Sequence, residues 1–298
     1  MELRVLKYFL AVAREGSITA AANSLHLTQP TLSRQLQELE KELGQKLLIR
    51  SKYKTGLTPE GMILRKRATE IVELVEKTES EFNSLNETIG GDIYIGCGET
   101  DSMKYIAQIM KDLQDEYSDI KFHIYSGNAE DVTEKLDKGL LDFGVLIQPI
   151  DLSKYDYITM PEKDVWGVIM RKDSPLAEKK EITLPDLIDK PIIASRQMSK
   201  KYSADSGFLD WFGKEFDNLN IVATYNLVYN AAIMVQAGMG VAITLDKLIN
   251  PTNHPNICFR PLRPKLESGL DIVWKRYQMF SPAAKIFLNR LHAKLENG

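Results

Sequence analysis

Residues 17–43 read SITAAANSLHLTQPTLSRQLQELEKEL, and Gly44 follows them. Ser17 and Thr28 are residue types that accept backbone N–H groups in the first turn of a helix, so each is placed to begin one. Pro30 is tolerated in the first turn of the second helix, and glycine is a typical helix end. The stretch therefore predicts two short helices joined by a tight turn.

The second of these helices has two chemically different faces. Leu32, Leu36, Leu39 and Leu43 step by four, three and four residues and form an apolar stripe. The opposite face carries Arg and Gln, which can bond guanine and adenine in the DNA major groove, and hydroxyls, which bond bases or phosphates. The candidate DNA contacts here are Ser17, Gln29, Pro30, Thr31, Ser33, Arg34 and Gln37. For the helix alone, an amphipathic helix with a solvated face is the alternative.

The flanking segments favour DNA binding. An amphipathic helix is predicted at the start of the chain, and with the next two helices it makes a helix-turn-helix unit. Residues 46–61 read KLLIRSKYKTGLTPEG, where Leu47 and Ile49 suit a strand, Gly56 a turn and Leu57 a returning strand. The tip of this predicted β-wing carries three cations that can each neutralise a phosphate: Arg50, Lys52 and Lys54.

Charge is distributed unevenly along the 298 residues, whose net charge is −3. Residues 1–65 hold ten Lys and Arg against six Asp and Glu, a net of +4, and the remainder has a net of −7. A basic N-terminal segment on an acidic body indicates a polyanionic partner. The sequence shows no membrane-spanning apolar run and no signal peptide, and its two cysteines have no metal spacing. A cytoplasmic location without membrane contact is expected.

Residues 1–61 resemble the winged helix-turn-helix of LysR-type transcriptional regulators. The matching positions are Phe9, Gly16-Ser17, the alanine run from Ala20, Leu25, Thr28-Gln29-Pro30, Ser33, Leu36, Leu39, Glu40, Leu43-Gly44, Leu47, Arg50 and Leu57-Thr58-Pro59-Glu60-Gly61. Leu48 stands where the family usually has Phe, and it keeps an apolar residue there. The resemblance implies a sequence-specific transcriptional regulator that binds double-stranded DNA at an operator or promoter, with RNA polymerase as a further candidate partner.

A long helix is predicted from Thr58, which can cap it, to about Asn86. Seven residues in it have the spacing of a heptad seam between paired helices: Leu64, Ala68, Ile71, Val75, Thr78, Phe82 and Leu85. The seam predicts dimerisation, because a helix-turn-helix usually reads a paired site with a paired protein. Packing on the chain's own body is the alternative. In the family this is the linker helix of the dimer, so a homodimer or homotetramer is expected.

After Gly90-Gly91 the pattern changes to alternating strands and helices. Strands are expected at residues 91–97, 120–127, 141–147, 165–170, 191–195, 220–226, 240–245 and 270–277, with helices between them, including one near 204–216, and one from Pro282. Such alternation predicts a parallel sheet covered by helices. Two similar units, with the chain returning to the first, resemble the periplasmic-binding-protein-like effector domain of the same family.

The expected fold is an all-α winged helix-turn-helix plus a long linker helix, followed by an α/β periplasmic-binding-protein-like effector domain of two subdomains. The expected boundaries are residues 1–58 for DNA binding, 59–89 for the linker and dimerisation helix, and 90–298 for effector binding. Subdomain I is expected at about 90–161 and 266–298, and subdomain II at about 162–265.

Ligands of open α/β sheets bind beyond the carboxyl ends of the strands, where helix N-termini offer free N–H groups. By this rule the candidate effector contacts are Glu99, Thr100, Ser102, Gly127, Asn128, Gln148, Ser195, Tyr229 and Thr244. A helix cap is the alternative role for several of them, and for Asp101 it is the expected one. Effectors in the family are often small carboxylates, which Glu99 would disfavour. If Glu99 points inward, a neutral or cationic effector is expected.

No pattern in the sequence predicts catalysis, a cofactor or a metal site. The four histidines are scattered, no GxSxG turn occurs, and the Gly-x-Gly turns lack the third glycine of a dinucleotide loop. The favoured function is a DNA-binding regulator modulated by a small-molecule effector. The alternatives are a regulator without a metabolite effector, either constitutive or redox-responsive through Cys97 and Cys258, a structural DNA-binding protein, and a solute-binding module.

Overall fold

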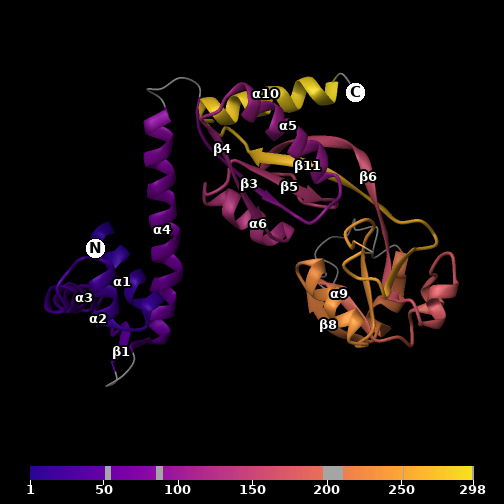
Figure 1. Ribbon diagram of the computed structural model, residues 1–298, viewed down its shortest axis with the longest axis horizontal. Coiled ribbons are helices and arrows are strands. Elements are labelled where there is room, and N and C mark those ends of the chain that lie inside the picture. Colours follow the sequence, from indigo (N-terminus) through magenta and orange to yellow (C-terminus); the bar gives the residue numbers. More distant parts are fainter. Residues whose placement is uncertain (51–54, 85–89, 197–210, 251, 297–298) are drawn as a thin grey trace. The chain divides into compact units, whose positions relative to one another are not determined.

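The computed structural model (Figure 1) describes residues 1–50, 55–84, 90–196, 211–250 and 252–296. The chain divides into two compact units, Met1–Phe82 and Asn83–Gly298. The first unit contains the predicted DNA-binding domain together with most of the predicted linker helix. The predicted three-part division at residues 58 and 89 stays a prediction.

Three helices begin the first unit, as predicted: α1 (Leu3–Glu15), α2 (Ile18–Ser24) and α3 (Gln29–Leu43). The hydroxyls of Ser17 and Thr28 each accept the backbone N–H group three residues later, so both predicted caps are confirmed. Gly16 and Gly44 follow α1 and α3 with φ angles of 64° and 67°, in the left-handed region that favours glycine. The local sequence therefore sets both ends of these helices.

The leucine stripe of α3 packs against α1 in the core of this unit. Phe9 and Leu32 have no exposed surface, and Leu36 is 1% exposed. Burying one such side chain fully stabilises the fold by roughly 1.5–3 kcal/mol. Leu43 differs from the prediction, because it lies in the last turn of α3 and is 39% exposed. The buried stripe therefore ends at Leu39, four residues earlier than the spacing predicts.

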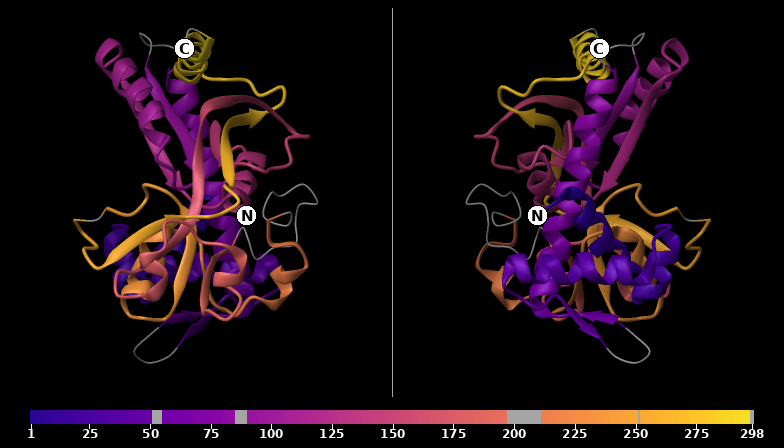
Figure 2. Two further views of the ribbon diagram at one scale, coloured as in Figure 1. Left: turned by 90° about the vertical axis from the view of Figure 1, so that its right-hand side faces the viewer. Right: turned by 90° about the vertical axis from the view of Figure 1, so that its left-hand side faces the viewer.

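The wing is a short antiparallel hairpin of β1 (Leu48–Arg50) and β2 (Thr55–Leu57). Both views in Figure 2 show these strands extending from the helices of the first unit. The prediction that Gly56 forms the turn is wrong, because Gly56 lies within β2 and pairs with Ile49. The chain between the two strands, residues 51–54, lies outside the described part.

Glu40 of α3 holds the first residues of the wing. It is only 5% exposed, and its Oε1 accepts the N–H groups of Leu47 at 2.9 Å and Leu48 at 3.2 Å, while Lys46 pairs with its Oε2 at 3.1 Å. Burial alone would raise the pKa of Glu40. The hydrogen bonds and the Lys46 charge outweigh burial and hold this pKa below its ordinary value.

The long helix α4 (Pro59–Ser84) follows the wing, and the Thr58 hydroxyl caps it by accepting the Gly61 N–H at 2.9 Å. Ala68 has no exposed surface and Val72 is 9% exposed, both within the core shared with α1 and α3. Figure 1 shows α1–α3 gathered around one end of α4, with the rest of the helix extending beyond them. The alternative of packing on the chain's own domain therefore holds for this part of α4.

The second unit is built on a nine-stranded sheet in the order β4-β3-β5-β11-β6-β9-β7-β8, with β10 paired to β6. Its strands are β3 (Gly91–Cys97), β4 (Ile120–Ser126), β5 (Phe143–Ile147), β6 (Tyr155–Arg171), β7 (Ile192–Ser195), β8 (Ile221–Tyr225), β9 (Val241–Leu245), β10 (Ile257–Pro261) and β11 (Glu267–Lys275). Its α-helices in the described residues are α5 (Met103–Glu116), α6 (Ala129–Asp137), α9 (Val228–Gln236) and α10 (Pro282–Glu296).

The prediction of a parallel sheet is corrected to a mixed one. β3 pairs in parallel with β4 and β5, and β7 with β8 and β9, whereas β6, β10 and β11 pair antiparallel. One cause is that β11 carries the chain back to its first half, between β5 and β6, and the other is that β6 runs antiparallel to β9 and β10. Strand β10 and the first half of β6 were not predicted from the sequence. The helix expected near 204–216 falls mostly outside the described residues, and its end is a 3-10 helix, Gly213–Asn218.

Two halves with separate hydrophobic clusters make up the second unit. The first cluster includes Phe143 and Phe287, and the second includes Phe212 and Ile243, all at most 1% exposed. The long strand β6 and the neighbouring β11 join the halves (Figure 1). In the described part of the chain, no helix has the length and hydrophobicity to cross a lipid bilayer.

Candidate DNA-reading face and ligand cavity

The predicted DNA-reading surface is the polar face of α3, formed by Gln29, Pro30, Thr31, Ser33, Arg34 and Gln37. All of these residues are exposed except Ser33, which is half-buried. The Arg34 side chain is 79% exposed, and its Nε donates to Glu38 Oε1 at 3.0 Å on the same helix. The Thr31 hydroxyl lies 2.8 Å from the Thr28 hydroxyl. The helix thus presents a row of polar groups with mostly local partners on a buried leucine core.

The other predicted DNA contacts are placed less completely. Ser17 is half-buried, and its hydroxyl accepts the Ala20 N–H as the cap of α2. Arg50 ends β1. Lys52 and Lys54 lie outside the described residues.

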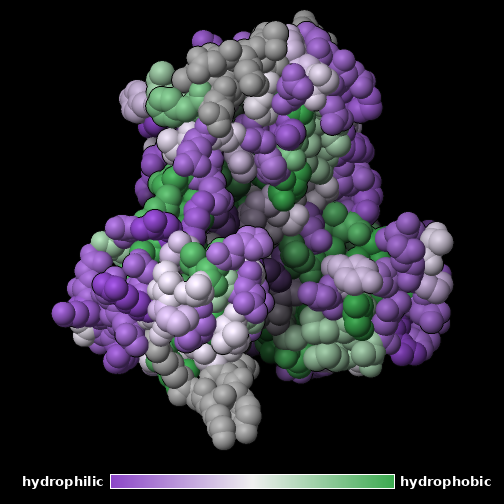
Figure 3. All heavy atoms as spheres, turned by 60° about the vertical axis from the view of Figure 1, so that its left-hand side comes forward, coloured by the Kyte–Doolittle hydropathy of each residue, from purple (hydrophilic) through white to green (hydrophobic). Residues whose placement is uncertain are grey.

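The predicted dimer seam divides into two parts along α4. Leu64 and Ala68 pack in the core of the first unit, whereas Ile71 is 37% exposed and Phe82 is 66% exposed. Val75 is half-buried, Thr78 is exposed, and Leu85 lies outside the described residues. In the space-filling view, hydrophobic residues appear as separate patches among hydrophilic ones on one face of the molecule (Figure 3). Among the seam residues that the structure describes, Ile71 and Phe82 in the second part are the exposed apolar side chains that could contact a partner helix.

A cavity with an empty volume of about 500 Å³, including its opening to solvent, lies between the two halves of the second unit. It sits where β3, β5, β7 and β8 end and where α6 and α9 begin, the position that the strand-end rule predicts. Its lining residues are Gly98, Glu99, Gly127, Asn128, Ala129, Val145, Leu146, Ile147, Trp166, Ser195, Tyr225, Asn226, Val228, Thr244, Leu245 and Leu248.

Five of the nine predicted effector contacts line this cavity: Glu99, Gly127, Asn128, Ser195 and Thr244. The Asn128 side chain also caps α6, because it accepts the Asp131 N–H at 2.9 Å. The alternative role as a helix cap is therefore found for Asn128. Thr244 is 1% exposed and its side chain bonds Tyr225, whose hydroxyl donates to the Ile243 carbonyl at 2.7 Å.

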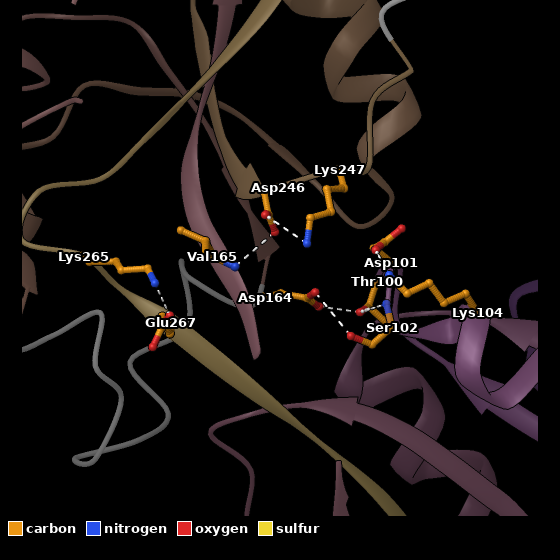
Figure 4. A network of polar contacts seen from close by, with 10 residues as sticks. All are labelled: Thr100, Asp101, Ser102, Lys104, Asp164, Val165, Asp246, Lys247, Lys265 and Glu267. Carbon is orange, nitrogen blue, oxygen red and sulfur yellow. Dashed lines mark hydrogen bonds and ion pairs between the residues drawn. The ribbon is translucent and has the colours of Figure 1, made fainter. Parts of the chain in front are cut away.

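Thr100 and Ser102 are not among the cavity-lining residues, so their role as effector contacts stays a prediction. The Thr100 hydroxyl donates to Asp164 Oδ2, and the Ser102 hydroxyl lies 3.4 Å from Asp164 Oδ1. Figure 4 shows both side chains directed at Asp164. Asp164 is 2% exposed, and burial is the main cause that raises the pKa of its carboxyl. These hydroxyls therefore stabilise a buried carboxyl that comes from β6, about sixty residues further along the chain.

Gln148 and Tyr229 also lie outside the lining residues. Gln148 donates to both carboxylate oxygens of Asp271, at 3.0 and 2.9 Å. Tyr229 is 59% exposed, and its ring lies edge-on to His254, with 5.7 Å between the ring centroids. Asp101 does not cap α5 as expected, because its carboxylate pairs with Lys104 at 2.7 Å.

Glu99 points into the cavity region and connects the two halves. It lies just after β3, and its Oε2 accepts the N–H of Val228, the first residue of α9. Burial raises the pKa of Glu99, and the Val228 hydrogen bond opposes that effect without cancelling it. A neutral or cationic effector was expected on the condition that Glu99 points inward. Glu99 lines the cavity, so this condition is met.

Sequence reasoning missed Asp164, Trp166 and Tyr225. Asp164 and Trp166 lie inside β6, which carries no strand-end signal, and Tyr225 is the last residue of β8. Applying the strand-end rule to β8 would have found Tyr225. No signal in the sequence pointed to Asp164, because its partners Thr100 and Ser102 come from a distant segment.

The redox alternative depends on Cys97 and Cys258. Cys97 is buried in β3, and burial is the main cause that raises the pKa of its thiol, which disfavours the reactive thiolate. Cys258 lies in β10, in the other half of the unit. Among the described residues no cluster of His, Cys, Asp and Glu has the arrangement of a metal site.

Comparisons with known proteins cover almost the whole chain. The family described as "LysR substrate binding domain" matches residues 86–296, and "Bacterial regulatory helix-turn-helix protein, lysR family" matches residues 3–62. The HTH-type transcriptional regulator BsdA of Bacillus subtilis (strain 168) is 31% identical over 304 residues, covering 97% of this chain and 99% of BsdA. The Hca operon transcriptional activator HcaR of Escherichia coli (strain K12) is 28% identical over 298 residues, covering 99% and 98%.

Solved structures of CbnR, a LysR family transcriptional regulator, have the same fold. CbnR alone aligns with a TM-score of 0.74 and 19% identity over 99% of each chain. Full-length CbnR complexed with its target DNA aligns with a TM-score of 0.72 and 20% identity, covering 98% of this chain and 99% of CbnR.

Proposed function

The chain belongs to the LysR family of DNA-binding transcriptional regulators, and we propose that the polar face of α3 reads its target sequence while a small molecule in the cavity modulates that binding. The protein is a regulator and not an enzyme. We infer that it acts in the cytoplasm, where its DNA partner is found, and that RNA polymerase is a further partner.

The observation that carries this proposal is the exposed polar face of α3. Arg34 and Gln37 stand on the side opposite to Leu32 and Leu36, which are at most 1% exposed. A helix anchored by one face can enter the major groove with the other, and Arg and Gln there can form paired hydrogen bonds to guanine and adenine. The CbnR–DNA complex supports this proposal by its similar fold.

Pairing of two protomers would give the regulator two α3 helices for the two halves of an operator. The exposed Ile71 and Phe82 of α4 are suited to such a contact, because apolar side chains lose their exposure to water when two helices pair. We propose a homodimer through this part of α4, or a homotetramer built from such dimers. In the full chain, Ile71→Asp or Phe82→Asp should shift the species seen in analytical ultracentrifugation toward the monomer. An unchanged distribution for both variants would remove α4 from the interface.

Modulation by a ligand requires that the ligand prefer one arrangement of the two halves. The cavity draws its lining from both halves, so a bound molecule would contact both at once. A ligand with different affinities for two arrangements shifts the population between them, and α4 would pass the change to the DNA-binding domain.

The experiment starts from the full chain and a pool of random DNA duplexes, from which the bound sequences are selected. The selected duplex is then footprinted with and without a mixture of small metabolites. We expect an enriched, two-fold symmetric sequence and a footprint that changes with at least one metabolite. No enrichment over the starting pool would contradict the DNA-reading role. Enrichment with a footprint that no metabolite alters would favour the constitutive alternative.

A further inference from the structure

The lining of the cavity carries a net negative charge in the described residues. Among the described residues that line it, Glu99 is the sole acidic side chain, and Lys, Arg and His are absent. The other polar side chains in the described lining are neutral. A negatively charged ligand would therefore meet a negative charge in the described lining without a compensating cation.

Several hydrogen-bond donors around the cavity are already used by the protein itself. At the start of α6 the Asp131 N–H is bonded to Asn128, and at the start of α9 the Val228 N–H is bonded to Glu99. The Trp166 Nε1–H donates to the Ser268 hydroxyl at 2.7 Å. These helix N-termini are the places where an anion is usually held. To bind the Asp131 or Val228 N–H group, an incoming carboxylate would have to displace the side-chain oxygen of Asn128 or Glu99.

An acceptor, in contrast, is still available. Glu99 uses Oε2 for the Val228 N–H, and its Oε1 has no hydrogen-bond partner within the described part of the chain. The carboxylate is half-buried, so an ionised Glu99 with one hydrogen bond is incompletely compensated. A cationic donor beside it would supply both the missing hydrogen bond and the missing charge.

The remaining lining suits the organic part of such a ligand. Val145, Ile147, Leu245 and Leu248 offer apolar contact, and Trp166 is an aromatic neighbour of the kind that attracts organic cations. Apolar walls also lower the local dielectric constant, which strengthens an ion pair with Glu99.

We propose that the cavity binds a small organic amine in its ammonium form, with the ammonium group on Glu99 and an apolar substituent against the aliphatic walls. This inference rests on the proposed function, in which the cavity holds the effector. It specifies the ligand class: a primary or secondary amine is accepted, and a carboxylate with the same carbon skeleton is rejected.

The test uses the full chain and matched sets of probes: phenethylamine with 2-phenylethanol and phenylacetate, and butylamine with butanol and butyrate. Binding is measured by isothermal titration calorimetry, and thermal unfolding reports it independently. We expect each amine to bind more tightly than its alcohol and its carboxylate. Glu99→Gln, which keeps an oxygen for the Val228 N–H, should weaken amine binding roughly ten- to hundredfold, the usual effect of losing a charged hydrogen-bond partner.

Asp101→Asn is the matched control, because it removes an acidic charge two residues away that pairs with Lys104 outside the cavity lining. It should leave amine binding unchanged. Binding of neither amine to the wild-type chain, or equal weakening by Asp101→Asn and Glu99→Gln, would overturn the inference. The inference would also be overturned if the carboxylates bound more tightly than the amines and Glu99→Gln left their affinity unchanged.

Failure of the inference is distinguishable from failure of the proposed function. A carboxylate that binds and changes the DNA footprint would refute the ligand class but support an effector-modulated regulator. An amine that binds through Glu99 and leaves the footprint unchanged would support the ligand class and contradict its role as effector.

Discussion

The polar face of α3 and the polar groups around the cavity are arranged in opposite ways. On α3, Arg34 and Gln37 are exposed, and the partner of Arg34 is Glu38, one turn along the same helix. Around the cavity, Glu99 and Thr100 bond groups in a different part of the second unit, Val228 and Asp164. The first surface is built from neighbours in the sequence, and the second from residues that the fold brings together.

This difference indicates how each site can act. An exposed side chain with a weak, solvent-accessible partner can exchange that partner for a base edge at little cost. A buried polar group with a distant partner ties two segments together, and breaking its bond leaves an unsatisfied group. This difference fits the proposed roles, which are rigid-body recognition of DNA for the α3 face and sensing of the arrangement of the two halves for the cavity.

The largest change in stability is expected when a side chain of the core beneath the α3 face is truncated. Phe9→Ala should lower the free energy of unfolding of the first unit by about 3–5 kcal/mol, because Phe9 has no exposed surface and its removal leaves a cavity. Leu43→Ala, at the 39% exposed end of the stripe, should cost less than about 1 kcal/mol. Chemical denaturation followed by circular dichroism measures both. If both variants lost the same free energy of unfolding, the polar face of α3 would not depend on the buried core around Phe9.

A smaller effect is expected from the network beside the cavity. Asp164→Ala should destabilise the second unit by about 1–3 kcal/mol, because it leaves the Thr100 and Ser102 hydroxyls without their buried acceptor. Asp173→Ala is the control, since Asp173 is exposed and pairs with the nearby, exposed Arg171, and it should leave the unfolding midpoint unchanged. If Asp164→Ala left the stability of the second unit unchanged, the network would not contribute to that stability.

Glu40 should give the smallest of the three stability changes. Glu40→Gln keeps an acceptor for the Leu47 and Leu48 N–H groups but removes the charge, so a loss of about 1 kcal/mol is expected at neutral pH. Denaturant titration at neutral pH measures it. A larger loss of stability for Glu40→Gln than for Asp164→Ala would contradict this ranking.

The Glu40 effect should also depend on pH in a definite direction. Because the folded-state pKa lies below the ordinary value of 4.5, the ionised carboxylate stabilises the fold fully above that value. The stabilisation is lost as the pH falls below 4.5 through the lowered pKa, and the two proteins should then converge in stability. A difference that persists or grows in acid would contradict the lowered pKa.

The two regions also differ in how far the sequence could predict them. The caps Ser17 and Thr28 and the end of α3 at Gly44 follow from contacts within a few residues and were predicted correctly. The buried face of α3 was predicted correctly for Leu32, Leu36 and Leu39, but not for Leu43. The strand-end rule located the cavity but did not separate Glu99, which lines it, from Thr100, which turns toward Asp164. Adjacent residues at a strand end differ in direction, and only the folded chain sets which distant group each one meets.

The position of β11 was unpredictable for a similar reason. Its apolar pattern gave the strand but not its direction, because strand direction depends on where the chain re-enters the sheet. β11 lies antiparallel between β5 and β6, and this placement contributes to the mixed sheet together with the antiparallel pairs of β6 with β9 and β10.

The central claim, that the polar face of α3 reads DNA, is tested most directly by measuring the affinity of Arg34→Ala for the selected duplex and for a scrambled duplex. Fluorescence anisotropy at one fixed salt concentration gives both values. We predict that the variant loses roughly 1–3 kcal/mol of binding free energy to the selected duplex and almost none to the scrambled one. An unchanged affinity for the selected duplex, or an equal loss on both, would contradict the claim.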